Sequence, residues 1–146
     1  MIAFPDVNVL VALAWPNHVH HERARAWFTE NHRRGWATSP VTESGFVRVS
    51  SNRRAIPAAV RPEEAIRLLR EMTALRGHAF WADDTSIARS RWIAAERLQG
   101  HGQVTDAHLV ALALRRRGQL VTFDGGIVDV LPPGIAAAFA LVVLGG

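Results

Sequence analysis

Four carboxylates in four separate segments are the residues whose types and spacing best predict chemistry. Asp6 and Asp124 each follow a short apolar run, and Glu43 and Asp106 lie in the first turns of predicted helices. In an open parallel sheet, ligands bind beyond the carboxyl ends of the strands, where the next helices begin. The four acids are therefore expected to converge at one edge of a sheet.

Clustered carboxylates repel one another and raise each other's pKa values unless a cation neutralises them. Oxygen ligands without cysteine suit a hard divalent ion, Mg²⁺ or Mn²⁺, which also binds phosphate oxygens. Such an ion can activate water and stabilise the leaving oxygen of a phosphodiester. Taken singly, each acid also fits a simpler role as a helix cap or turn residue. Only their joint placement favours a metal site.

The basic residues point to a phosphate-bearing partner. All 17 are arginine, the net charge is +4, and setting the four acids aside leaves 17 arginines against nine acids. An acidic pocket in a basic surround is the pattern expected of a metal-dependent nuclease. Arg53 and Arg54, in a predicted loop, are weak candidates for RNA contacts, whereas Arg115, Arg116 and Arg117 are interpreted as a solvated helix end.

Two missing residue types exclude several classes of function. Without lysine there is no Schiff-base chemistry and no P-loop, and without cysteine there is neither a disulfide scaffold nor a thiolate metal site. The longest apolar run, Ile135 to Leu144, is about half of a bilayer span, and the start of the chain lacks the pattern of a signal peptide. The protein is expected to be soluble and cytoplasmic.

The elements that must position these acids follow from the alternation of short apolar runs and helical patterns. The 146 residues, 49% hydrophobic and 21% charged, fit a single globular domain covering 1–146. The alternation predicts a three-layer α/β fold, with a central, mostly parallel sheet of about five short strands flanked by helices. The expected strands are 2–5, 36–38, 79–82, 119–123 and 139–144.

Capping residues predict where the helices begin. Ser39-Pro40 combines a side-chain cap with a proline that needs no amide partner, and Pro62 is followed by acids in a first turn. Helices are expected over 7–15 and 18–31, from Pro40, from Pro62, from caps at Asp83 to Ser86 as far as about residue 98, and from a cap at Thr105 to Gly118.

The motifs around these four acids resemble those of the PIN-domain family of metal-dependent ribonucleases, and within it the VapC-type toxins of bacterial toxin–antitoxin pairs. The likeness lies in four motifs, whose order, spacing and intervening elements agree over nearly the whole chain: Phe4 to Leu13, Ser39 to Phe46, Val104 to Ala113 and Leu120 to Asp124. It implies a PIN-like fold and an endoribonuclease that uses Mg²⁺ or Mn²⁺.

The resemblance also implies roles for particular residues. Asp6, Glu43, Asp106 and Asp124 would hold the metal, with Asn8 and Thr122 as their polar neighbours: each is two positions from an acid. It further implies an RNA substrate, a homodimer, and a small antitoxin whose tail fills the active-site groove. The sequence departs from the family after the fourth acid, where Gly125, Gly126 and Ile127 replace the usual acidic or polar residue and aromatic.

Two alternatives remain open from the residues alone. A PIN-fold module that binds RNA without cutting it is compatible with the loosened Gly125-Gly126 loop. A haloacid-dehalogenase-like phosphatase would use an aspartate after the first strand as its nucleophile, but it needs a second acid where Asn8 stands and usually an ammonium to clamp phosphate.

Overall fold

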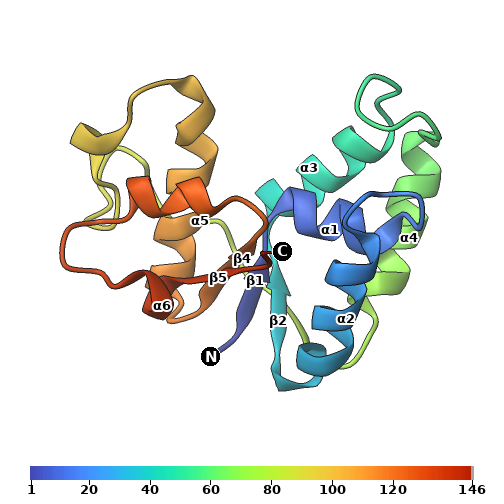
Figure 1. The fold of residues 1–146 in the computed structure, drawn as a ribbon, viewed down its shortest axis with the longest axis horizontal. Helices are drawn as coiled ribbons and strands as arrows, with labels where there is room; N and C mark the ends of the chain where they lie inside the picture. The colour runs from blue at the N-terminus through green and yellow to red at the C-terminus, as the bar shows by residue number, and fades with distance from the viewer. Residues whose placement is uncertain (146) are drawn as a thin grey trace.

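Five short strands form one sheet in the order β3-β2-β1-β4-β5, and every neighbouring pair is parallel. The computed structural model describes residues 1–145 (Figure 1). The strands are β1 (Ala3–Pro5), β2 (Trp36–Thr38), β3 (His78–Phe80), β4 (Gln119–Thr122) and β5 (Leu141–Val143). The predicted fold class, a parallel sheet of five strands flanked by helices, is confirmed.

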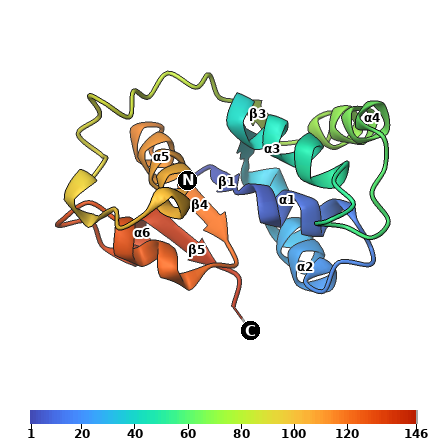
Figure 2. The same cartoon turned by 90° about the horizontal axis from the view of Figure 1, so that it is seen from above.

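Helices cover both sides of this sheet. They are α1 (Val7–Ala14), α2 (His21–Asn31), α3 (Pro40–Ser50), α4 (Pro62–Thr73), α5 (Val104–Arg115) and α6 (Ala137–Ala140). In both views, α1 to α4 gather on one side of the central strands, while α5 and α6 lie on the other (Figures 1 and 2). No helix within residues 1–145 is long and apolar enough to cross a membrane.

Two hydrophobic cores lie beneath these groups of helices. One joins Leu10 of α1, Phe46 of α3 and Trp36 of β2, all fully buried. The other joins Leu112 of α5 to Leu120 of β4. Because α1 and α3 belong to one core and α5 to the other, the carboxyl edge of the sheet is where side chains from both can meet.

Strand register and caps fix the positions of the first acids at this edge. Pro5 pairs with Val121, and the Asp6 amide donates to the Val121 carbonyl at 2.9 Å. Asp6 is then the N-cap of α1. Ser39 caps α3 in the same way: its hydroxyl accepts from the Thr42 amide, while the Thr42 hydroxyl accepts from the Ser39 amide. This reciprocal pairing makes the predicted helix start a capping box.

Several boundaries differ from the sequence-based expectation by a few residues. The second helix begins at His21, after a stretch of turns, and the last strand is shorter than predicted because residues 137–140 form α6. The expected cap at Thr105 is wrong: a 3₁₀ turn (His101–Gln103) runs directly into α5, so the backbone is already helical at Thr105.

The helix expected from Asp83 to about residue 98 is also wrong. Residues 81–100 form turns and irregular backbone with a single 3₁₀ turn, Ala95–Arg97. The two aspartates interpreted as caps bind α5 instead. Asp83 Oδ1 lies 2.7 Å from His108 Nε2, and Asp84 accepts two hydrogen bonds from the Arg115 guanidinium. These long-range contacts hold the segment against α5 and leave no caps for a helix of its own.

Gly45 sets how closely α3 approaches α1. A Cβ atom at this position would overlap the branched side chain of Val7 in the first turn of α1. Because Asp6 caps that same turn and Glu43 lies two residues before Gly45, the contact positions two of the predicted acids relative to each other.

We expect Gly45→Ala to lower the free energy of unfolding by about 1–3 kcal/mol, since forced overpacking of a core typically costs this much. Urea denaturation of the variant and the parent protein measures the difference. Gly102→Ala is a matched control, because a Cβ there would meet no atom within 4 Å. Adding Val7→Ala to Gly45→Ala should recover part of the loss. Equal stability of Gly45→Ala and its parent would contradict the tight contact.

Candidate active site

Asp6 is the buried centre of the carboxylate site. Its side chain is 7% exposed, and its Oδ1 accepts a hydrogen bond of 2.9 Å from the Val9 amide, as an N-cap does. The Thr122 hydroxyl at the end of β4 also bonds to this carboxyl group. Two fixed donors therefore orient the carboxylate before any ligand arrives.

The electrostatics of the site are dominated by negative charge. The pKa of Asp6 is raised to about 6. Burial is the main cause, the hydrogen bonds from Thr122 and Val9 act against it, and the charges of Asp106 and Asp124 add to the rise. Asp106, half-buried in the first turn of α5, also has a raised pKa, first through burial and then through Asp124. Three of the four predicted acids thus act on one another.

Asp124 lies on the exposed side of this group. Its Oδ1 accepts from the Gly126 amide at 2.8 Å, and its own amide donates to the Thr122 hydroxyl oxygen at 3.0 Å. Thr122 therefore contacts both Asp6 and the loop that carries Asp124. The Asp124 side chain caps the 3₁₀ helix Gly125–Val130, so the two glycines after it form a helical turn.

The Glu43 side chain is directed toward the end of β2. The Thr38 hydroxyl, at the end of β2, donates to Glu43 Oε2 at 2.6 Å and lies 2.8 Å from His78 Nε2 of β3. Because the single hydroxyl proton goes to Glu43, the His78 Nε2–H donates to Thr38. Burial lowers the pKa of His78, with Glu43 opposing that shift, which agrees with a neutral imidazole in this chain of hydrogen bonds.

The residues present fit a divalent cation. Within residues 1–145, no arginine or histidine pairs with Asp6, Asp106 or Asp124, so their charge is uncompensated. In the described part of the chain, no three Asp, Glu or His side chains are already grouped as metal ligands. Mg²⁺ needs only one or two direct carboxylates and keeps several waters, so this looser arrangement of oxygen donors suits it.

The remaining predicted residues are at the periphery. Asn8 is exposed on α1, and its side chain makes no hydrogen bond within residues 1–145. Arg53 and Arg54 are exposed in the loop between α3 and α4, and neither forms an ion pair in the described chain. All three are accessible to a large ligand.

Two neighbours of the site were not predicted. The His20 ring, at the N-cap of α2, stacks on Phe123 with centroids 4.6 Å apart and so supports the loop that carries Asp124. His78 reaches Glu43 through Thr38. Spacing gives no signal for either contact, because each joins residues about 35 to 100 positions apart. The only local sign is Phe123, an aromatic residue next to the predicted Asp124.

The family model described as the PIN domain matches residues 3–130. The chain belongs to the PIN domain family. Its relatives include Ribonuclease VapC39 of Mycobacterium tuberculosis, which is 48% identical over 135 residues that cover 92% of this chain and 97% of the relative. Ribonuclease VapC38 of the same organism is 51% identical over 126 residues, covering 86% of this chain and 87% of the relative.

Solved structures share the fold at much lower identity. The crystal structure of Mycobacterium tuberculosis VapC20, described as a sarcin-ricin loop cleaving toxin, has a TM-score of 0.60 and 16% identity, covering 92% of this chain and 97% of that one. FitAcB from Neisseria gonorrhoeae has a TM-score of 0.62 and 18% identity, covering 98% of each.

The buried charge of Asp6 should make the metal-free protein less stable as the pH rises. The pKa of Asp6 is 3.8 in the unfolded chain and about 6 in the folded protein. The free energy of unfolding therefore falls as the pH rises between these two values, by about 3 kcal/mol in full. Asp6→Asn keeps an oxygen to cap Val9 but carries no charge. We therefore expect the variant to be more stable than the parent at pH 7.5 in EDTA, with a smaller advantage at pH 5.

Urea denaturation at the two pH values measures both differences. Asp129→Asn, an exposed carboxylate outside the site, serves as the control and should show no such pH-dependent gain. If Asp6→Asn destabilises the protein equally at both pH values, the Asp6 carboxylate is not repelled in the folded state.

Proposed function

We propose that this protein is a metal-dependent endoribonuclease, the toxin component of a type II toxin–antitoxin pair. The observation that carries the proposal is the uncompensated negative charge of Asp6, Asp106 and Asp124 at the carboxyl edge of a PIN-domain sheet. The names of relatives that are 48–51% identical over most of both chains support ribonuclease activity.

Mg²⁺ or Mn²⁺ is the proposed cofactor, held by Asp6, Asp106 and Asp124, with Glu43 as the fourth ligand. When bound, the ion supplies an activated water and stabilises charge on the leaving oxygen of the phosphodiester. Val9 and Thr122 fix the orientation of the Asp6 carboxylate, so this side chain loses little conformational entropy when the ion binds. Glu43 would have to turn away from the Thr38 hydroxyl to join these ligands.

The chain's other residues would handle the RNA. Arg53 and Arg54 are free to contact backbone phosphates, and such contacts would make the affinity fall with salt. The stacked His20 and Phe123 rings lie beside the loop of Asp124 and would limit the space around the scissile bond. Together these side chains would orient the strand, while the buried carboxylates carry the charge chemistry.

The partners follow from the same assignment. One solved neighbour is described as FitAB bound to a DNA fragment, and such a pair supports a small antitoxin partner for this chain. We also propose a homodimer acting in the cytoplasm, where RNA is available as substrate. The phosphatase alternative gains no support from the relatives, whereas an RNA-binding module without cleavage is an outcome of the test below.

Asp106→Asn should abolish both Mn²⁺ binding and RNA cleavage, because it removes a charge from the proposed metal site. Calorimetric titration of Mn²⁺ and mapping of new 5′ ends in total bacterial RNA measure the two effects on the same samples. Asp129→Asn, with the same charge change on the exposed surface, should behave like the parent. Cleavage by Asp106→Asn at the parent's rate would contradict the proposal. RNA binding without any cleavage by the parent would favour the binding module.

Thr122→Val should weaken Mn²⁺ binding about 10–100-fold, the usual effect of removing a hydrogen bond to a ligating group. The change keeps the shape of a fully buried side chain while deleting the donor to Asp6. Thr122→Ser retains the hydroxyl and should restore most of the affinity. Calorimetric titration compares the three proteins, and an unchanged affinity in Thr122→Val would show that this hydrogen bond has no part in holding the metal.

A further inference from the structure

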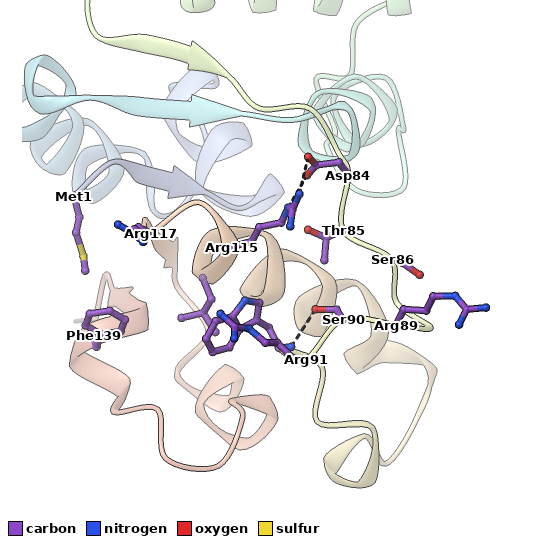
Figure 3. Close-up of a pocket in the computed structure, with 12 residues that line it drawn as sticks. Met1, Asp84, Thr85, Ser86, Arg89, Ser90, Arg91, Arg115, Arg117 and Phe139 are labelled. Atoms are coloured by element: carbon purple, nitrogen blue, oxygen red, sulfur yellow. Dashed lines mark hydrogen bonds and ion pairs between the residues drawn. The ribbon is translucent and has the colours of Figure 1, made fainter.

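A cavity of about 910 Å³ lies beside the C-terminal end of α5, which contributes Leu114 and Arg115 to its lining (Figure 3). Its lining comes from segments that precede β4 and β5 and from the irregular chain after β3. It includes Arg89, Arg91, Arg115, Arg117, Trp92 and Phe139. The volume falls within the range of roughly 300–1,000 Å³ typical of ligand pockets.

The charge around this cavity is positive and largely unpaired. Asp84 is its one acidic lining residue, and that carboxylate is engaged by the Arg115 guanidinium at 3.1 and 3.2 Å. The side chains of Arg89, Arg91 and Arg117 have no carboxylate partner within residues 1–145. The Arg89 side chain extends away from the other two (Figure 3). The unpaired guanidinium groups of Arg91 and Arg117 favour an anionic ligand, and their planar geometry matches phosphate.

Arg91 is already held in place by an aromatic ring. Its guanidinium carbon lies 4.4 Å from the centroid of Trp92. Such a cation–π contact restrains the guanidinium while leaving its N–H groups available to oxygen acceptors. The phosphate-binding group would therefore lose little freedom when a ligand arrives.

Arg117 occupies a position that normally favours glycine. At the end of α5, the Gly118 amide bonds to the Ala113 carbonyl at 2.8 Å and the Arg117 amide to the Leu114 carbonyl at 3.1 Å, which is the Schellman pattern. The residue that adopts the left-handed backbone conformation of this pattern is Arg117, with φ of 57°. An arginine held there at a conformational cost, with its side chain lining the cavity, indicates a use for that side chain.

Thr85 supplies an independent sign of a missing ligand. It lines the same cavity and is 9% exposed, yet its hydroxyl has no hydrogen-bond partner within the described residues. Buried polar groups are nearly always paired. An unpaired hydroxyl in the lining is a group that an oxygen of a bound ligand would satisfy.

The cavity also offers aromatic surface. Phe139 is 50% exposed and lies on the opposite side of the cavity from Arg89 and Thr85 (Figure 3), and Trp92 also lines the cavity. Flat rings beside guanidinium groups are the combination that binds single-stranded nucleic acid, because bases stack on the rings while phosphates contact the cations.

We propose that this cavity binds a nucleotide unit of single-stranded RNA away from the scissile bond, with its phosphate on Arg91 and Arg117 and its base against the aromatic wall. Asp106 and Arg115 are nine residues apart on α5, or about 14 Å along the helix axis. A strand several nucleotides long could therefore reach both places. The choice of RNA as the ligand rests on the proposed function, whereas the anion-binding character of the cavity does not.

Binding is best measured in EDTA, by fluorescence anisotropy of a labelled 12-nucleotide single-stranded RNA. Without divalent ions the RNA stays intact and the carboxylates repel it, so the affinity reports on the arginine surface alone. Arg91→Gln combined with Arg117→Asn should raise Kd at least tenfold. It should also lower the slope of log affinity against log salt by about 1.4, or about 0.7 for each lost phosphate contact.

Two sets of variants separate the cavity from general charge and from misfolding. Arg67→Gln with Arg70→Gln removes the same charge from exposed positions on α4 and should leave Kd nearly unchanged. Arg117→Gly relieves the left-handed backbone, so it should raise the thermal midpoint while still weakening RNA binding. Phe139→Ala should weaken binding without changing the salt slope, because it removes stacking and no charge.

Three results would overturn the inference. These are an equal loss of affinity in the α4 control, no RNA binding by the parent at low salt, and a poly-glutamate peptide of equal length that binds as tightly and responds to the same substitutions. The last would assign the cavity to an acidic protein segment. Cavity-dependent RNA binding in EDTA, with no cleavage after Mn²⁺ is added, would support the cavity and count against the proposed nuclease.

Discussion

Negative charge buried without a cation is the constraint on which the rest of the structure depends. A carboxylate that is 7% exposed, beside two further acids, is costly to keep ionised, and here only an amide and a hydroxyl offset that cost. Those two donors exist because Asp6 caps α1 and because parallel register brings Thr122 beside it. Regular secondary structure therefore holds these carboxylates close together although they repel one another, as expected of a site that binds a ligand.

Local signals in the sequence were enough to predict the elements that carry the acids. The Ser39-Pro40 start of α3 is a genuine capping box, β2 has the predicted bounds, and β1 and β4 end just before the acids expected beyond them. Each of these features depends on neighbours within a few residues. Because parallel strands share one carboxyl edge, this local information also predicts that the acids converge.

Contacts between distant residues account for what the sequence did not predict. Asp83 and Asp84 have the composition of helix caps, yet they pair with α5 some 25 to 31 residues later, so the segment around them stays irregular. The direction of Glu43 depends on Thr38 and on His78 from another strand. The partners of Asp83, Asp84 and Glu43 cannot be predicted from spacing alone. Many polar residues lie at comparable separations in the sequence, and only the folded structure determines which of them meet.

The division of the hydrophobic interior into two cores has a consequence for cooperativity. Asp6 and Glu43 are attached to the core of α1 and α3, whereas Asp106 and Asp124 are attached to that of α5 and β4. An ion coordinated from both sides would act as a cross-link between two halves that otherwise meet along the central strands. Binding of the ion would raise the free energy needed to open either half locally, because opening would break the coordination. Local fluctuations in the two halves would therefore become coupled.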